Sequence, residues 1–376
     1  MKQTVAIVVA ALTLAATGGT LAGEAERTPL IQIAILLDTS NSMDGLIAQA
    51  KAHLWRVVNQ FATAKREGKR PELQVALYEY GNDRIPAGEG HIRMVCHLTT
   101  DLDKVSEELF ALTTNGGQEY CGQVIKVATE SLAWSNSKDD LKAIFIAGNE
   151  PFTQGKVDYA ASCKAAIEKG IVVNTIHCGP YQTGVDGKWQ DGAQLAEGTY
   201  ANIDQNRTEV AIAAPQDKDI ATLSAKLNTT YIAYGKGGGA GQLRQQQQDS
   251  NAGSLAASVF AERARAKASQ NYRNEAWDLV DAIEASKVKI EEVKEEDLPE
   301  NLRKMTQQER QAFVAARAKE RKQVQEEIQK LYEARKKFVA EEMKKRSQDN
   351  KGDKGLDEAM VKTLREQAAK RNFQLE

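Results

Sequence analysis

With 376 residues, 41% of them hydrophobic, the chain is long enough to bury one sizeable domain and a smaller region beside it. Its 50 Lys and Arg residues nearly cancel its 52 Asp and Glu residues, which leaves a formal net charge of -2. This balance excludes the broad positive field on which nucleic-acid-binding proteins rely, so we expect no nucleic-acid partner.

The first 23 residues have the pattern of a secretory signal peptide. Lys2 precedes an apolar run from Val5 to Ala16, and small residues follow as far as Gly23. The run is shorter than the roughly 20 residues that a membrane-spanning helix needs, and no later segment qualifies. We therefore predict that residues 1–23 are a signal peptide and that the protein is exported, periplasmic or secreted, with no transmembrane segment after signal removal.

Residues 28–235 alternate between buried strands and amphipathic helices. Apolar runs predict strands at residues 30–37, 73–80, 91–98, 141–147, 171–177 and 200–203. Apolar residues at helical spacing predict helices at residues 46–61, 102–112, 122–133, 158–169 and 218–227, the last of which closes the domain. This alternation predicts an α/β fold, a doubly wound and mostly parallel sheet with helices on both faces.

Four cysteines fall within this domain, namely Cys96, Cys121, Cys163 and Cys178. An oxidising compartment would permit one or two disulfides among them. The alternative is that they remain buried free thiols, because a domain of this size does not need such crosslinks.

The composition changes at Gly235. Residues 236–253 are rich in Gly and Gln, which predicts a flexible linker. Residues 254–376 are charged and helix-forming, so we predict an α-helical C-terminal region, helical over 254–283, with a long helix that begins at a capping box of Thr306 and Glu309. Its apolar stripe is patchy for a coiled coil, although these helices are candidates for oligomerisation.

Asp38, Ser40 and Ser42 lie on one loop directly after the first predicted strand. In an open α/β sheet, ligands bind outside the carboxyl ends of the strands. One carboxylate and two hydroxyls form a set of hard oxygen donors, which suits Mg²⁺ and also Mn²⁺ or Ca²⁺. The alternative is that Asp38 caps the next helix, that the serines bond its first amides, and that no metal binds.

An aliphatic strand that leads into Asp-x-Ser-x-Ser and then a helix resembles the metal-ion-dependent adhesion site of von Willebrand factor A domains. The resemblance implies a VWA-like, Rossmann-like fold and an ion, most simply Mg²⁺, that captures an acidic group of a partner. In place of the family's threonine ligand stands Glu119, and in place of its aspartate after the fourth strand stands Asn149. Both positions depart from the pattern, and Glu119 restores the carboxylate that Asn149 lacks.

These features predict a binding protein and not an enzyme. No histidine lies near Ser40 or Ser42 in the sequence, and neither serine stands in a Gly-x-Ser-x-Gly elbow. We expect an exported, metal-dependent adhesion module that captures a protein or cell-envelope partner, with the helical region as spacer or oligomerisation element. The alternative is a structural scaffold that binds no metal and acts through its C-terminal helices.

Overall fold

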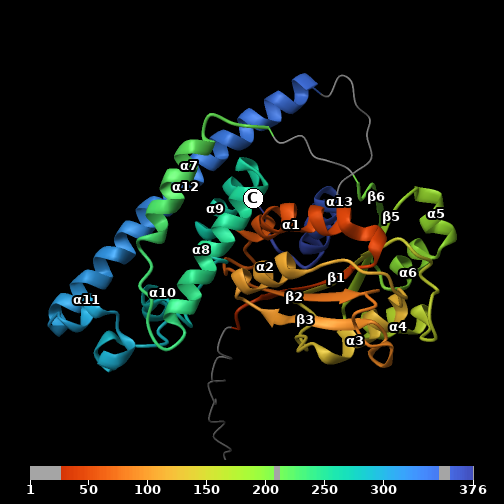
Figure 1. Ribbon diagram of the computed structural model, residues 1–376, viewed down its shortest axis with the longest axis horizontal. Helices are drawn as coiled ribbons and strands as arrows, with labels where there is room; N and C mark the ends of the chain where they lie inside the picture. The colour runs from red at the N-terminus through yellow and green to blue at the C-terminus, as the bar shows by residue number, and fades with distance from the viewer. Residues whose placement is uncertain (1–26, 207–211, 347–355, 376) are drawn as a thin grey trace, which may run out of the picture.

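The computed structural model describes residues 27–206, 212–346 and 356–375 (Figure 1). Residues 1–23, the predicted signal peptide, lie outside these ranges. A six-stranded sheet carries helices on both faces, and a helical region extends from one side of it. The predicted fold class is therefore confirmed, as a mostly parallel, doubly wound sheet followed by a helical C-terminal region.

Six strands form the sheet: β1 (Leu30–Asp38), β2 (Glu72–Tyr80), β3 (Ile92–Thr99), β4 (Leu141–Gly148), β5 (Val172–Cys178) and β6 (Tyr200–Ile203). Their order across the sheet is β3-β2-β1-β4-β5-β6, and every neighbouring pair is parallel except β2 with β3. The direction of winding therefore reverses between β1 and β4. The predicted strand ends differ from these bounds by no more than one residue.

Strand β1 alternates its side chains between two hydrophobic cores, because both faces of the sheet are covered. Ile31, Ile33 and Leu37 point into one core, and Ala34 and Leu36 into the other. The first core is covered by α1 (Asp44–Val58) and α2 (Leu102–Ala111), and the second by α3 (Cys121–Ser131), α4 (Tyr159–Glu168) and α6 (Trp189–Leu195). The remaining short elements here are α5 (Tyr181–Asp186), η1 (Asn41–Met43), η2 (Asn59–Phe61) and η3 (Ala87–Glu89).

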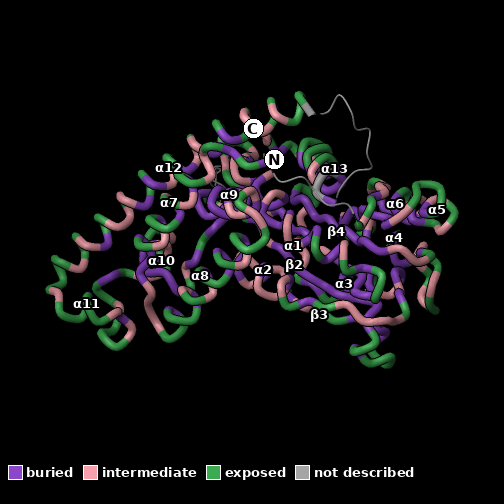
Figure 2. Tube along the Cα trace, turned by 45° about the horizontal axis from the view of Figure 1, so that its top comes forward, coloured by how far each residue is buried: buried purple, intermediate pink, exposed green. Residues whose placement is uncertain are grey.

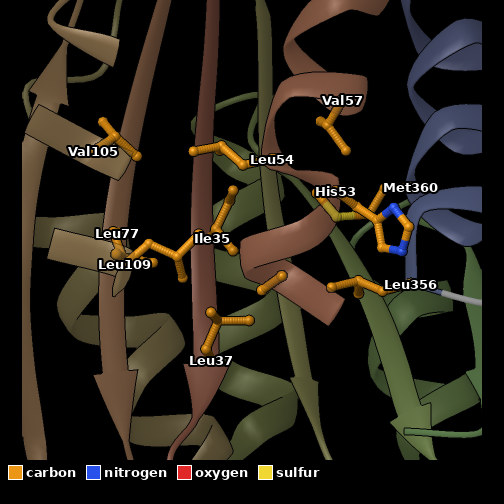
Figure 3. A pocket seen from close by; sticks show the side chains of 11 residues that line it. Ile35, Leu37, His53, Leu54, Val57, Leu77, Val105, Leu109, Leu356 and Met360 are labelled. Carbon is orange, nitrogen blue, oxygen red and sulfur yellow. The ribbon is translucent and has the colours of Figure 1, made fainter. Parts of the chain in front are cut away.

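The last helix, α13 (Leu356–Lys370), completes the first core, although the helical region separates it in sequence from the rest of that core. Its Leu356 and Met360 lie against α1 and face Ile35 of β1 across a small apolar pocket (Figure 3). The side-chain amides of Gln367 in α13 and Asn174 in β5 exchange two hydrogen bonds, of 2.6 and 3.2 Å. The predicted domain of residues 28–235 is thereby corrected, because residues 27–206 and 356–375 together build the α/β domain.

The helical region comprises α7 (Asp217–Asn228), α8 (Gly238–Leu255), α9 (Ala257–Lys267), α10 (Leu279–Glu284), α11 (Glu300–Arg303), α12 (Gln307–Arg346), η4 (Ile290–Glu292) and η5 (Glu295–Asp297). Helix α7 packs against α9 and α12, so the prediction that residues 218–227 close the sheet domain is wrong. The predicted helix of residues 254–283 is interrupted between α9 and α10. Among the described helices, none is long and apolar enough to cross a membrane.

The predicted capping box at the start of α12 is confirmed. The backbone N–H of Thr306 donates to Glu309 Oε2 at 2.8 Å, and the backbone N–H of Glu309 donates to Thr306 Oγ1 at 3.3 Å. These two bonds satisfy amides that have no partner inside the helix, so they fix where α12 begins. Figure 2 shows mostly exposed residues along α12, whereas the strands of the sheet are largely buried.

The predicted linker of residues 236–253 is also corrected, because α8 occupies most of it. A side chain at Gly241 would place its Cβ 2.3 Å from the ring of Trp277, so this glycine permits close packing. Gln245 is buried and donates to Tyr272 Oη at 3.1 Å, and Gln248 accepts from Ser106 Oγ at 2.8 Å. Glycine and glutamine here serve helix packing and buried hydrogen bonds.

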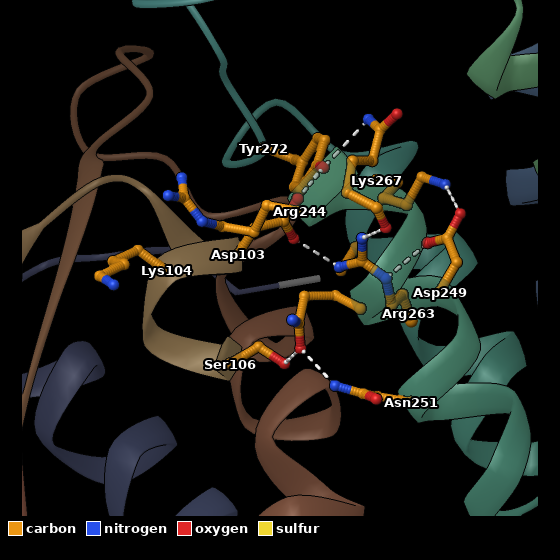
Figure 4. Close-up of polar contacts among 12 residues, drawn as sticks. Asp103, Lys104, Ser106, Arg244, Asp249, Asn251, Arg263, Lys267 and Tyr272 are labelled. Carbon is orange, nitrogen blue, oxygen red and sulfur yellow. Dashed lines mark hydrogen bonds and ion pairs between the residues drawn. The ribbon is translucent and has the colours of Figure 1, made fainter. Parts of the chain in front are cut away.

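Buried charges join the helical region to the α/β domain (Figure 4). Arg263 in α9 is 0% exposed, lies over the Trp55 ring, and forms 2.6 Å ion pairs with Asp103 of α2 and Asp249 of α8. Lys267, equally buried, pairs with Asp249 at 2.7 Å. The helical region therefore packs directly against α1 and α2 of the α/β domain.

The four cysteines all lie in described parts of the α/β domain, and all are buried and free. Burial raises the pKa of the Cys96 and Cys163 thiols, to about 11 and about 12. Of the two alternatives for these cysteines, the structure bears out buried thiols.

Candidate functional site

The candidate site lies where the winding of the sheet reverses. Strands β1 and β4 are parallel neighbours, so their carboxyl ends lie side by side at one edge of the sheet. Asp38 is the last residue of β1, and Asn149 directly follows β4. This is the crevice in which open α/β sheets bind ligands, because loops from opposite sides of the reversal separate there.

The loop after β1 holds a chain of short polar contacts. Asp38 is 0% exposed, and its Oδ1 accepts a hydrogen bond of 2.7 Å from the backbone N–H of Ser40. The hydroxyl oxygens of Ser40 and Ser42 lie 3.3 Å apart, and Ser42 Oγ donates to Asn149 Oδ1 at 3.2 Å. Four of the five predicted site residues are thus connected by contacts of hydrogen-bonding length.

Glu119, the fifth predicted residue, brings a second carboxyl group to Asp38. It lies just before α3, is 5% exposed, and its side chain lies beside that of Asp38, since a Cβ at Gly81 would touch both. Burial, together with the neighbouring Asp38 carboxyl group, raises the pKa of Glu119 well above its usual range. Burial also raises the pKa of Asp38. Without a cation, the two adjoining carboxyl groups therefore retain a proton between them.

One oxygen of each carboxyl group has no hydrogen-bond partner. These atoms are Asp38 Oδ2 and Glu119 Oε2, and both are buried. A buried oxygen without a partner destabilises the folded state, because it has lost its hydrogen bonds to water and no protein group replaces them. The unsatisfied atoms thus belong to the two carboxyl groups that face each other at the reversal of the sheet.

Two glycines, which the sequence reasoning missed, shape the walls of the site. A Cβ at Gly81, whose φ is +78°, would lie 2.8 Å from Glu119 Cγ and 2.9 Å from Asp38 Oδ1. A Cβ at Gly148 would lie 2.4 Å from Tyr80 Oη and 3.1 Å from Asp38 Oδ2. Only glycine leaves room for both carboxyl groups, and the sole sequence signal was a glycine after each of two predicted strands.

Three further side chains, also missed, hold the loops in place. Gln154 Oε1 accepts from the backbone N–H of Glu119, which ties the loop after β4 to the loop before α3. Trp189 Nε1 donates to the carbonyl of Glu150 at 2.8 Å, and His177 Nε2 lies 3.2 Å from the carbonyl of Asn149. No local motif marks these residues, because each acts on a loop distant in sequence.

The donor set fits a hard divalent cation. The described residues contain no cluster of three or more His, Cys, Asp and Glu side chains of the kind that holds a metal on its own. The site instead combines the carboxylates of Asp38 and Glu119 with the hydroxyls of Ser40 and Ser42 and the amide oxygen of Asn149. Mg²⁺ suits such a site, since it binds through one or two carboxylates and keeps several waters. The role of these five residues as metal ligands stays a prediction.

Comparison with known proteins identifies one family model that matches part of the chain. Residues 32–195 match the family model of the von Willebrand factor type A domain. A search of the curated proteins gave no match.

Several solved structures resemble part of the chain. The conserved hypothetical protein BatB from Bacteroides thetaiotaomicron is 19% identical, and the match covers 46% of this chain and 90% of that one, with a TM-score of 0.36. The VWA domain of SpRpn10 is 16% identical, and the match covers 48% of this chain and 100% of that one, with a TM-score of 0.36. The vWF domain of the type V pili tip protein Mfa5 from Porphyromonas gingivalis is 12% identical, and the match covers 47% of this chain and 90% of that one, with a TM-score of 0.35.

Proposed function

We propose that this chain, which carries a von Willebrand factor type A domain over residues 32–195, is an exported binding protein that holds a divalent cation beside Asp38 and contacts a partner there. Domains of this family mediate protein interactions, which supports a binding role. The proposal includes no catalytic step. Asp38 and Glu119 provide the charge that holds the cation, and Ser40, Ser42 and Asn149 provide neutral oxygens.

The observation that carries the proposal is the pair of unsatisfied oxygens, Asp38 Oδ2 and Glu119 Oε2. Two buried carboxyl groups side by side cannot both ionise unless a positive charge lies between them. A divalent cation would replace the proton that the pair retains and provide a partner for both oxygens. When bound, it supplies positive charge and coordination positions open to solvent or to a partner.

Cation binding is tested by isothermal calorimetry and thermal unfolding of the mature full chain with Mg²⁺, Mn²⁺ or Ca²⁺ and with EDTA. At about a hundred times its dissociation constant, the ion adds about 2.7 kcal/mol to the free energy of unfolding. We expect an unfolding midpoint higher by several degrees in the parent. The variant Asp38→Asn keeps the shape of the side chain and should lose the response.

The matched control for that experiment is Asp139→Asn, because Asp139 is exposed and precedes β4 at the opposite edge of the sheet. This variant should respond to the ion as the parent does. An equal response of the parent and Asp38→Asn, or no response in either, would refute cation binding at this site.

Export is a separate part of the proposal and has its own test. The full-length chain and a chain without residues 2–23 are expressed in a bacterial host, followed by fractionation and mass spectrometry. We expect the full-length chain outside the cytoplasm and shortened near Gly23, and the truncated chain in the cytoplasm. Retention of the intact full-length chain in the cytoplasm would contradict export without bearing on the cation site.

A further inference from the structure

We infer that Glu119 supplies at the cation the negative charge that a carboxylate of a partner would otherwise supply, and that the partner of this face presents basic side chains. This inference rests on the proposed cation site and names the chemistry of its partner. It departs from the acidic partner group that the sequence resemblance implies. Three observations lead to it: the charge inside the site, the charge around it, and the burial of Glu119.

The chain itself supplies enough negative charge to balance a divalent ion. Asp38 and Glu119 are both buried, and their side chains lie beside each other at Gly81. Two carboxylates cancel the charge of one divalent cation. A third carboxylate, from a partner, would bring a net negative charge to the ion beside two carboxylates that are already buried, which is unfavourable. The partner's contact with the ion is therefore expected to be through a neutral oxygen or through water.

The surface around the site carries more negative charge. Glu150 follows Asn149 and lies close enough to act electrostatically on Glu119. Asp83 lies beside Asn41, since a Cβ at Gly116 would be 3.6 Å from Asp83 Oδ2 and 3.3 Å from Asn41 Nδ2.

Asp44 is the third acidic residue of this rim. It opens α1 two residues after Ser42, and its Oδ1 accepts from the hydroxyl of Thr114. We call Asp44, Asp83 and Glu150 the acidic rim.

The acidic rim has little positive charge to balance it. In the described parts of the chain, none of its three carboxylates forms an ion pair with Lys or Arg. Asp83 Oδ1 lies 3.8 Å from His91 Nδ1, which carries charge only when protonated. Arg84 donates to Thr113 Oγ1 at 3.0 Å and brings one positive charge to the neighbouring loop, and Lys51 of α1 acts electrostatically on Asp44. A basic partner would therefore be attracted to this face, and an acidic one repelled.

The experiment uses the mature full chain loaded with Mg²⁺ at about 0.15 M salt. Two fluorescent decapeptides, one of lysine and one of glutamate, are the probes, and binding is followed by fluorescence anisotropy. We expect the lysine probe to bind and the glutamate probe not to bind. The double variant Asp83→Asn, Glu150→Gln should weaken binding of the lysine probe roughly five- to tenfold.

A matched control keeps the effect specific to this face. Glu168 is exposed at the end of α4, which lies at the opposite edge of the sheet, so Glu168→Gln should leave binding of the lysine probe unchanged. If Glu168→Gln weakens binding as much as the double variant does, the acidic rim is not the docking surface and the inference is overturned.

The role of Glu119 is tested by Glu119→Gln, which keeps the size of the side chain and removes its charge. The ion then faces one carboxylate and retains a net positive charge. We expect Mg²⁺ affinity to fall at least about tenfold and the glutamate probe, at saturating Mg²⁺, to begin to bind.

Two results would overturn the inference, and they are distinguishable. If calorimetry shows Mg²⁺ binding and the parent captures the glutamate probe as well as Glu119→Gln does, Glu119 does not exclude carboxylates. In that case the cation site stands and only this inference fails. If calorimetry shows no Mg²⁺ binding to the parent, the proposed function fails and the inference fails with it.

Discussion

The α/β domain and the helical region are stabilised by different interactions, although they pack against each other. The sheet separates two apolar cores, and its four inner strands, β2, β1, β4 and β5, are buried nearly throughout. The helical region has smaller apolar clusters and buries several basic side chains, most of which pair with aspartates. Arg321 is 4% exposed and pairs with Asp278 and Asp281 at 2.7 and 2.6 Å, and Arg335 pairs with Asp217 at 2.6 Å.

This difference determines which substitutions each region tolerates. Apolar packing tolerates substitutions that conserve volume, whereas a buried ion pair is satisfied only by one partner in one geometry. A buried pair contributes little net stability, yet removal of one member leaves a charge without compensation. The helical region should therefore be sensitive at a few charged residues, and the α/β domain at many apolar ones.

The largest effect is expected for Arg263→Ala. Arg263 compensates Asp103 and Asp249 in the interface between the two regions, and all three side chains are largely buried. Its removal leaves the buried Asp103 without an ion-pair partner and Asp249 with Lys267 alone, which costs about 3–5 kcal/mol of the free energy of unfolding. Urea unfolding measures this cost. Arg273→Ala is the control, because the Arg273 side chain is 58% exposed, and it should change stability by less than about 0.5 kcal/mol.

The next prediction tests the assignment of α13 to the α/β domain. Leu364 is 0% exposed and lies in the first core with α1, so Leu364→Ala should cost about 2–5 kcal/mol. Lys362→Ala, on the exposed face of the same helix, should cost little, since its side chain is 72% exposed. Equal stability of the two variants in urea unfolding would mean that α13 is not part of this core.

The sequence predicted the α/β domain well and the helical region poorly, for a physical reason. A strand buried on both faces is nearly continuously apolar, so residues 30–37 and 141–147 were recognisable locally although they contain Gln32 and Lys142. Helix α8 contains Gln245 and Gln248 where a core helix usually has apolar residues, and its buried hydrogen bonds reach Tyr272 and Ser106. Because those partners are distant in sequence, no periodicity shows them.

The closing helix of the sheet was misplaced for a related reason. Helices α7 and α13 have similar lengths and apolar spacing, and α7 comes first in the chain. Sequence order alone therefore favoured residues 218–227 as the helix that closes the sheet domain. In the structure α13 has this role, because its Leu356 and Met360 pack against α1.

Some residues of the candidate site could likewise be predicted from local sequence, and others could not. Asp38, Ser40 and Ser42 share one loop, so their proximity followed from the sequence alone. Placing Glu119 and Asn149 beside them required the family resemblance, since Glu119 lies in the loop before α3 and Asn149 in the loop after β4. The glycines at 81 and 148 could not be inferred, because their role depends on how closely Asp38 and Glu119 approach the backbone.

A smaller effect is expected from the pH dependence of Asp249. Burial opposes its ionisation, but the charges of Lys267 and Arg263 outweigh burial and lower its pKa from 3.8 to about 2. The folded state therefore binds fewer protons than the unfolded state between these values, so stability is present above about pH 4 and lost as the pH falls towards 2. The shift corresponds to roughly 2 kcal/mol.

The measurement is urea unfolding of the parent and Asp249→Asn from pH 6 to pH 2.5. The parent should be the more stable protein at pH 6, and the difference should shrink below pH 4 because only the parent loses this contribution. Asp139→Asn, an exposed control, should show the parent's pH profile. A constant difference between the parent and Asp249→Asn would contradict the lowered pKa.

The smallest effect is expected at an ion pair of the same region that lies in solvent. Lys304 and Glu300 approach to 2.6 Å, closer than Lys267 and Asp249 do, but their side chains are 73% and 81% exposed. Water and salt screen such a pair, so Glu300→Gln should change the free energy of unfolding by less than about 0.5 kcal/mol. Distance alone would rank the two pairs the other way. If urea unfolding shows Glu300→Gln to be as harmful as Asp249→Asn, burial is not what makes the charges of the helical region important.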